Sequence, residues 1–213
     1  MKRLPPKLLA LSPGDLKEGQ DLGPFLARCD SAIASGLEAV LLREHQLSDG
    51  SMYALALALR ERLDALPNEC GWLGVHDRVH VALASKADGI HLGFRSLSPQ
   101  QTKPLTGDAM VIGLSTHAHD RVEAWTHADY LFHGPFKPTS SKAGILDSIG
   151  LNGLESACSK TDRPIWALGG VGIEDVDSIL KTGVNGVAVL SGILGQSDPS
   201  VATTRYLAGW GQA

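Results

Sequence analysis

The sequence contains few of the features that hold small secreted proteins together or bind metals through sulfur. Only three cysteines occur in 213 residues, Cys29, Cys70 and Cys158, and none of them forms a CxxC pair. An odd number of widely spaced cysteines predicts neither a disulfide framework nor a zinc ribbon. A chain of this length buries roughly 70% of its unfolded surface on folding, so it needs neither disulfides nor a bound metal to fold.

Long apolar segments and runs of one charge are also missing. No stretch approaches the ~20 apolar residues that a membrane span requires. The apolar segment at residues 8–11 is too short for a signal peptide. The net charge is −4, from 19 basic and 23 acidic residues, a balance that favours neither a nucleic acid nor an anionic membrane as partner. We therefore expect a cytoplasmic protein without nucleic-acid or membrane partners.

Short apolar runs alternate with longer amphipathic segments along the whole chain. Eight of these runs are bounded by Gly, Pro, Asp or Ser and predict buried parallel strands, at residues 7–11, 39–43, 71–75, 89–92, 110–114, 130–133, 164–168 and 186–190. Helical patterns are clearest over 52–66, 78–85 and 173–182. This alternation predicts the α/β class and a single (β/α)8 TIM-barrel domain over residues 1–213. The alternative is an open doubly wound sheet, but the GxGxxG that usually follows its first strand is absent.

Glycines follow the last two predicted strands. In barrels of this kind the functional residues lie at the carboxyl ends of the strands, and phosphate is often bound at the last two of them. The seventh predicted strand ends at Gly169-Gly170 and the eighth at Ser191-Gly192. Glycine lets backbone N–H groups approach an anion closely. We predict a phosphate site at Gly169, Gly170, Ser191 and Gly192; two ordinary tight turns are the alternative.

Two further segments carry groups that suit catalysis or anion binding. Ser115-Thr116-His117 ends the fifth strand, where a histidine that faces the ligand transfers protons near neutral pH. The alternative is that His117 caps the next helix. The longest irregular stretch, residues 134–150, contains Thr139, Ser141 and Lys142, which suit an anionic group. A polar loop without a function has the same composition.

Several motifs in one order resemble the thiamine phosphate synthase and TenI family. They are KADGIHLG at 86–93, IGLSTH at 112–117, ADYL at 128–131, GPFKPTSSK at 134–142, WALGG at 166–170 and GVAVLSGI at 186–193. Arg43-Glu44 after the second strand fits as well, which adds Arg43 to the substrate-binding candidates. The resemblance implies an eight-stranded barrel that binds the phosphate of a thiazole near Gly170, Ser191 and Gly192.

The family contains two chemistries. The synthase joins hydroxymethylpyrimidine diphosphate to thiazole phosphate with the help of Mg²⁺. The resemblance gives it Asp77 as a metal ligand, Ser115 as a pyrimidine contact and Lys142 as a diphosphate contact. The TenI branch is a thiazole tautomerase, an isomerase that moves a proton without a metal. The resemblance gives it His117 as the proton shuttle, and its Ser-x-Ser-Pro run resembles residues 96–99.

Three departures separate the chain from the synthase pattern. The run Gly93-Phe94-Arg95-Ser96 stands where the family has Gly-Gln-Glu-Asp, His45 stands for a lysine, and Leu41 stands for a glutamine. Magnesium prefers hard oxygen ligands, so an arginine beside a serine is a poor replacement for a carboxylate.

We therefore expect a tautomerase that uses no cofactor, with His117 as the catalytic residue and a phosphorylated thiazole as its small-molecule partner. A Mg²⁺-dependent synthase and a non-catalytic or regulatory binder of a thiamine precursor are the alternatives. His45, His76 and Ser96 leave the exact substrate open. A homo-oligomer is also open.

Overall fold

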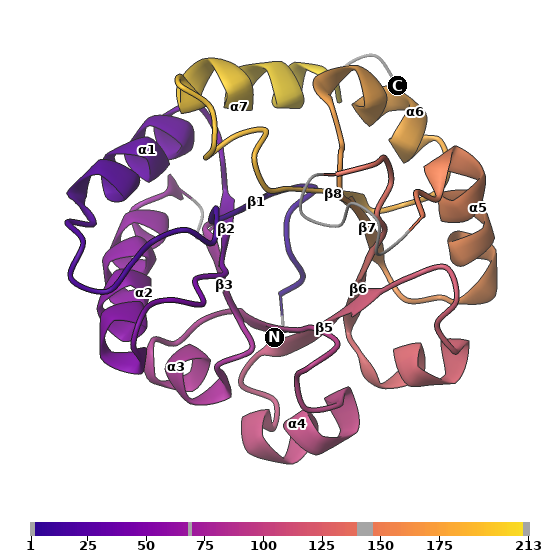
Figure 1. Cartoon of the computed structure of the whole chain (residues 1–213), viewed down its shortest axis with the longest axis horizontal. Coiled ribbons are helices and arrows are strands. Elements are labelled where there is room, and N and C mark those ends of the chain that lie inside the picture. Colours follow the sequence, from indigo (N-terminus) through magenta and orange to yellow (C-terminus); the bar gives the residue numbers. More distant parts are fainter. Residues whose placement is uncertain (1–2, 68–69, 140–146, 211–213) are drawn as a thin grey trace.

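Eight parallel strands close into a barrel in chain order, and helices surround it (Figure 1). The computed structural model describes residues 3–67, 70–139 and 147–210. The strands are β1 Leu8–Leu11, β2 Ala39–Leu42, β3 Trp72–His76, β4 Gly89–Leu92, β5 Val111–Thr116, β6 Tyr130–His133, β7 Ile165–Leu168 and β8 Gly186–Val189. The predicted fold class is confirmed. Two strands have the predicted bounds, and the others differ by one or two residues at one or both ends.

The outer layer consists of α-helices and two 3₁₀ helices. They are α1 Gly23–Ala34, α2 Asp49–Asp64, α3 Val79–Ala84, α4 Pro99–Thr106, η2 Val122–His127, α5 Gly150–Lys160, η4 Ile173–Asp175, α6 Val176–Leu180 and α7 Pro199–Ala208. The helix predicted over 173–182 is therefore a 3₁₀ turn followed by a short α-helix. No helix in the described ranges is long and apolar enough to cross a membrane. The cytoplasmic location and the homo-oligomer stay predictions.

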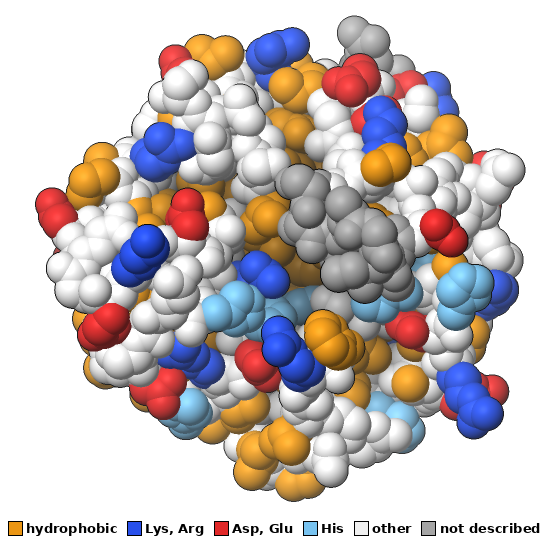
Figure 2. Space-filling view, in the orientation of Figure 1, with side chains coloured by type: hydrophobic (Ala, Val, Ile, Leu, Met, Phe, Trp, Pro, Cys, Tyr) orange, Lys and Arg blue, Asp and Glu red, His pale blue; other side chains and the backbone are white. Residues whose placement is uncertain are grey.

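Side chains of the strands alternate between the barrel interior and the helix layer, as the pleat requires. The interior cluster contains the rings of Trp72, Tyr130, Phe132 and Trp166. Strand glycines make room for these rings, since a Cβ at Gly113 would overlap the ring of Tyr130. A hollow opens above them at the carboxyl ends of the strands. Figure 2 shows this face, with histidine and Lys or Arg side chains gathered beside the hollow.

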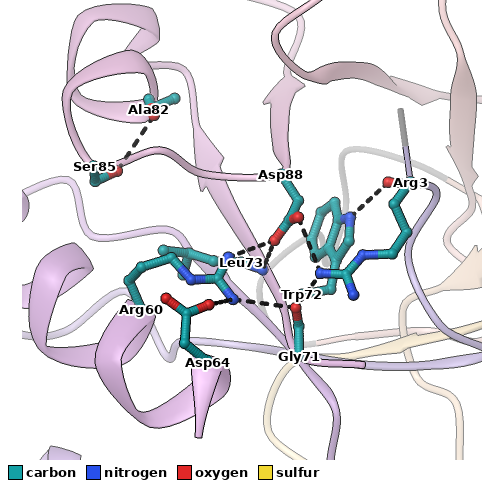
Figure 3. Close-up of polar contacts among 9 residues, drawn as sticks. All are labelled: Arg3, Arg60, Asp64, Gly71, Trp72, Leu73, Ala82, Ser85 and Asp88. Atoms are coloured by element: carbon teal, nitrogen blue, oxygen red, sulfur yellow. Dashed lines mark hydrogen bonds and ion pairs between the residues drawn. The ribbon is translucent and has the colours of Figure 1, made fainter. Parts of the chain in front are cut away.

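An ion-pair network closes the opposite, amino-terminal end of the barrel (Figure 3). Asp88 accepts hydrogen bonds from the backbone N–H of Leu73 at 2.8 Å, from Arg60 Nη1 at 2.6 Å and from Arg3 Nη2 at 3.0 Å. Both arginines also donate to the carbonyl of Gly71. One carboxylate thus joins the start of the chain, α2 and the amino end of β3. At this end of the barrel, such contacts serve stability.

Replacing Asp88 with alanine is expected to lower the free energy of unfolding by about 3 kcal/mol, because it leaves the Leu73 N–H without its partner and removes the less exposed of the two carboxylates that pair with Arg60. The control is Asp108→Ala, which breaks an ion pair with Lys103 that involves a 91% exposed carboxylate. That change should cost less than about 1 kcal/mol. Urea denaturation of both variants measures the difference, and equal losses would contradict the structural role of Asp88.

Candidate active site at the barrel mouth

The glycines after β7 and β8 form a region of unpaired backbone donors. Gly169 and Gly170 have φ values of +92° and +68°, in the left-handed region that glycine adopts without strain. Within the described part of the chain, the N–H groups of Gly169, Gly170, Ser191 and Gly192 donate no hydrogen bond. The β7–β8 register, Leu168 beside Ala188, brings the two loops next to each other. We call these four residues the phosphate loops, since their free N–H groups suit an anion.

Contacts from neighbouring elements fix the first phosphate loop. The backbone N–H of Lys137 donates to the carbonyl of Gly169 at 2.9 Å, and Lys137 Nζ lies 2.7 Å from both carboxylate oxygens of Asp175. From α7, the hydroxyl of Tyr206 donates to the carbonyl of Val171 at 2.8 Å. These bonds hold the backbone in place before a ligand arrives, which reduces the entropy lost on binding.

The long β6–α5 loop lies only partly within the described residues. Thr139 is described and is half-buried. Ser141 and Lys142, the other two predicted anion ligands on this loop, lie outside the described residues.

The two predicted residues at the end of β5 lie in different surroundings. Ser115 Oγ is 2.9 Å from His91 Nε2 inside the barrel. The His117 ring lies 3.4 Å from Asp120 Oδ2 and borders a cavity of about 210 Å³ that is also lined by Trp125 and by Lys160 of α5. The same cavity is lined by His133, Gly134 and Pro135, so it lies between the end of β6, η2 and α5. The structure thus does not bring His117 together with Ser115.

Sequence reasoning missed a line of three histidines across the carboxyl ends of β2, β3 and β4. The ring centroids of His45 and His76 are 5.6 Å apart at 90°, and those of His76 and His91 are 6.1 Å apart. His91 stacks on Phe132 with centroids 3.9 Å apart. We call these three residues the histidine line. Their positions at or just beyond the ends of three adjacent strands are the signal that would have joined them.

Burial and nearby arginines keep the histidine line neutral. Burial lowers the pKa of His76 to about 4, with a further contribution from the charge of Arg43. Burial also lowers the pKa of His91 well below its ordinary value. The pKa of His45 is lowered by burial and then by the charges of Arg43 and Arg95. Neutral rings accept or donate hydrogen bonds here without adding charge.

Two guanidinium groups lie beside the histidine line. Arg43 follows β2 and is half-buried, and Arg95 follows β4 and is exposed. Among the described residues, no ion pair joins Arg43 or Arg95 to a carboxylate. Glu44, the nearest acid in sequence to Arg43, accepts the backbone N–H groups of Gly14 at 2.8 Å and Leu16 at 2.9 Å instead. We call this region, with its two guanidinium groups outside ion pairs beside the carboxylate of Asp77, the cationic side of the mouth.

The donor groups on this side do not fit Mg²⁺. Asp77 follows β3, but Arg95 and Ser96 stand after β4, and Ser96 Oγ already accepts the N–H of Gly93 at 2.7 Å. Within the described ranges, no three His, Cys, Asp or Glu residues gather as a possible metal site. Mg²⁺ is held mainly by carboxylates and water. Asp77, predicted as a metal ligand under the synthase alternative, therefore has no second carboxylate among the described residues to complete the site.

Neutral buried histidines make stability depend on pH. The pKa values of His76 and His133 are both about 4, below the ordinary 6.5, chiefly because of burial. The unfolded chain therefore binds protons between pH 6.5 and 4 that the folded chain does not, so stability falls as pH falls through this window. From pH 7 to pH 5 the loss should be about 2 kcal/mol per histidine.

Unfolding by urea at the two pH values tests this expectation. His133→Gln should reduce the loss between pH 7 and pH 5 by about 2 kcal/mol. His127→Gln, at an exposed position of η2, serves as the control and should leave the loss unchanged. An equal pH dependence in both variants would show that His133 does not titrate in this way.

Known proteins match the chain over most of its length. Residues 16–193 match the family described as thiamine monophosphate synthase. The chain is 34% identical over 192 residues to a putative thiamine-phosphate synthase of Geobacter sulfurreducens, covering 89% of this chain and 87% of that protein. It is 36% identical over 179 residues to the thiamine-phosphate synthase of Clostridium novyi, covering 83% and 86%. The thiamine phosphate pyrophosphorylase from Pyrococcus furiosus superimposes with a TM-score of 0.80 at 30% identity, covering 95% of this chain and 94% of that one.

These matches confirm the resemblance drawn from the motifs. They also bear on the choice between the two chemistries, because the relatives and the solved structure carry names of the synthase reaction. The tautomerase prediction is not supported by them, and the synthase alternative is favoured.

Proposed function

The chain belongs to the thiamine monophosphate synthase family, and on this premise we propose that it is a transferase of thiamine biosynthesis. In the proposed reaction it joins hydroxymethylpyrimidine diphosphate to thiazole phosphate and releases diphosphate. The observation that carries the proposal is the presence of two separate groups of unpaired donors at one barrel mouth, the backbone N–H groups of the phosphate loops and the guanidinium groups of Arg43 and Arg95. Such a pair suits two phosphorylated substrates held together for reaction.

The two regions lie on different arcs of the closed barrel, since β1 separates β8 from β2, and β5 and β6 separate β4 from β7. The phosphate loops follow β7 and β8, whereas Arg43 and Arg95 follow β2 and β4 (Figure 1). The first region offers uncharged backbone donors, and the second offers two guanidinium groups. A tautomerase acts on one substrate and depends on His117, whose ring borders the cavity between the end of β6, η2 and α5 and is 3.4 Å from Asp120 Oδ2. The geometry thus favours the two-substrate reaction.

Each region has a role in the proposed reaction. The phosphate loops bind the thiazole phosphate and orient its ring over the mouth. The guanidinium groups bind the diphosphate and stabilise the negative charge that grows on it as its bond to the pyrimidine methylene carbon breaks. Ser115, held by His91 at 2.9 Å, presents a hydroxyl between the two regions for the pyrimidine. We assign no step to Mg²⁺, because the described residues do not fit it.

The test supplies purified protein with both substrates and with each one alone. We expect diphosphate release and a coupled product, identified by mass, only when both are present. A parallel reaction with the thiazole carboxylate phosphate follows aromatisation by ultraviolet absorbance. Aromatisation without coupling would overturn the proposal in favour of the tautomerase, and binding without either reaction would overturn it in favour of a non-catalytic binder.

A further inference from the structure

The cationic side of the mouth has a consequence for how the diphosphate is held. We infer that Arg43 and Arg95 bind the diphosphate group directly, in the place where a divalent cation would otherwise mediate its binding. This inference rests on the proposed function for the identity of the ligand. Its physical basis is independent of that proposal. It comes from the lack of an ion pair between either arginine and a carboxylate in the described ranges, and from the charges around the two arginines.

Arg43 is a half-buried guanidinium without a carboxylate partner in the described ranges. By contrast, two other arginines of intermediate exposure have carboxylate partners: Arg60 contacts Asp88 at 2.6 Å, and Arg78 contacts Asp49 at 3.1 Å. Removing a charge from water is unfavourable unless an opposite charge compensates it. An anionic ligand is the missing partner of Arg43.

Arg95 brings a second guanidinium to the same place. It lies over the exposed ring of Phe94, with Cζ 5.2 Å from the ring centroid. Its charge lowers the pKa of His45, after the larger effects of burial and of Arg43. It also lowers the pKa of Arg43, where burial has the larger effect and the charge of Glu44 acts in the opposite direction. Two planar guanidinium groups offer paired N–H donors that match the oxygens of a phosphate. A diphosphate has enough oxygens and charge to engage both.

The positive charges of Arg43 and Arg95 also disfavour the binding of a divalent cation at this place. A cation beside Asp77 would lie in the field of Arg43 and Arg95, with one carboxylate to offset it. Like charges at such separations repel, and Mg²⁺ gives up its water only to a strong set of oxygen ligands. Guanidinium groups and Mg²⁺ are therefore alternative ways to neutralise the diphosphate, and this chain has the first.

Calorimetric titration with inorganic pyrophosphate tests the inference in the presence of EDTA and again with millimolar Mg²⁺. We expect the affinity in EDTA to be within about threefold of that in Mg²⁺, since guanidinium donors replace the metal. Arg95→Ala should weaken binding in EDTA by about tenfold or more. The control is Arg205→Ala, which removes an exposed arginine from the outer helix α7 and should leave affinity unchanged.

A second variant reverses the charge of the site. Arg95→Glu combined with Ser96→Asp supplies the carboxylates that Mg²⁺ prefers, so pyrophosphate binding should be lost in EDTA and restored by Mg²⁺. Binding by the unchanged protein that requires Mg²⁺ would overturn the inference, and so would equal behaviour of Arg95→Ala and Arg205→Ala. If coupling occurs only with Mg²⁺, the inference fails and the proposed function stands. If pyrophosphate binds in EDTA but no coupling occurs, the inference stands and the proposed function fails.

Discussion

Replacing Ser191 with glutamate should weaken the binding of thiazole phosphate by about 100-fold or more, equivalent to about 2.7 kcal/mol. Ser191 is exposed, and its N–H belongs to the four unpaired donors of the phosphate loops. A carboxylate at this position would place a negative charge beside the bound phosphate and offer an internal partner to the same donors. Because Ser191 already carries a Cβ, the change needs no rearrangement of the backbone.

Two matched variants distinguish the effect of the new charge on affinity from the effects of side-chain size and of the lost hydroxyl. Ser191→Gln has nearly the size of the glutamate without its charge and should keep most of the affinity. Ser191→Ala keeps the backbone N–H and should change the affinity by less than about threefold, because the side-chain hydroxyl is not the main donor. Calorimetric titration with thiazole phosphate measures all three. Equal losses of affinity for Ser191→Glu and Ser191→Gln would mean that a larger side chain blocks the site sterically and that the loop does not bind an anion.

Replacing Arg43 with alanine should lower kcat/KM for the coupling reaction by about 1000-fold, because it removes a preorganised positive charge from the leaving diphosphate. The same substitution should not lower the stability of the protein. The guanidinium is half-buried and has no carboxylate partner in the described ranges, so its removal ends an unfavourable desolvation. We expect the melting temperature to stay the same or rise, as at other functional sites where stability and activity conflict.

The charge-conserving variant Arg43→Lys sharpens this test. Lysine keeps the charge but lacks the planar pair of donors, so activity should be intermediate. Arg121→Ala, at an exposed position before η2, controls for the general loss of one positive charge. A lower melting temperature with unchanged turnover per folded molecule would contradict the assignment, since Arg43 would then be a structural residue.

The barrel and its phosphate loops were accessible from the sequence because both depend on local patterns. Short apolar runs bounded by turn residues predict strands, and glycines at 169 and 170 occupy the left-handed backbone region that they alone adopt easily. The bounds of η4 and α6 were less accessible. A 3₁₀ turn and a short α-helix have similar sequence patterns, and packing decides between them.

The cationic side of the mouth was harder to predict because it depends on closure of the barrel. Arg43, His76 and Arg95 are far apart in the sequence, and only adjacent strand ends bring them together. For His117, a local sequence pattern was not sufficient to predict where the side chain points. The alternation of strand side chains stops at Thr116, where β5 ends, and the ring of His117 lies 3.4 Å from Asp120 Oδ2. Position just after a strand therefore did not establish that His117 faces the ligand.

The central claim is that one mouth holds two anions at once, in two separate regions. The most direct measurement is a titration of pyrophosphate into protein saturated with thiazole phosphate, in EDTA, followed by calorimetry. We expect one pyrophosphate to bind per chain, with an affinity within about threefold of that without thiazole phosphate. Strong competition between the two ligands, with pyrophosphate binding only as thiazole phosphate leaves, would contradict the claim and reduce the mouth to a single anion site.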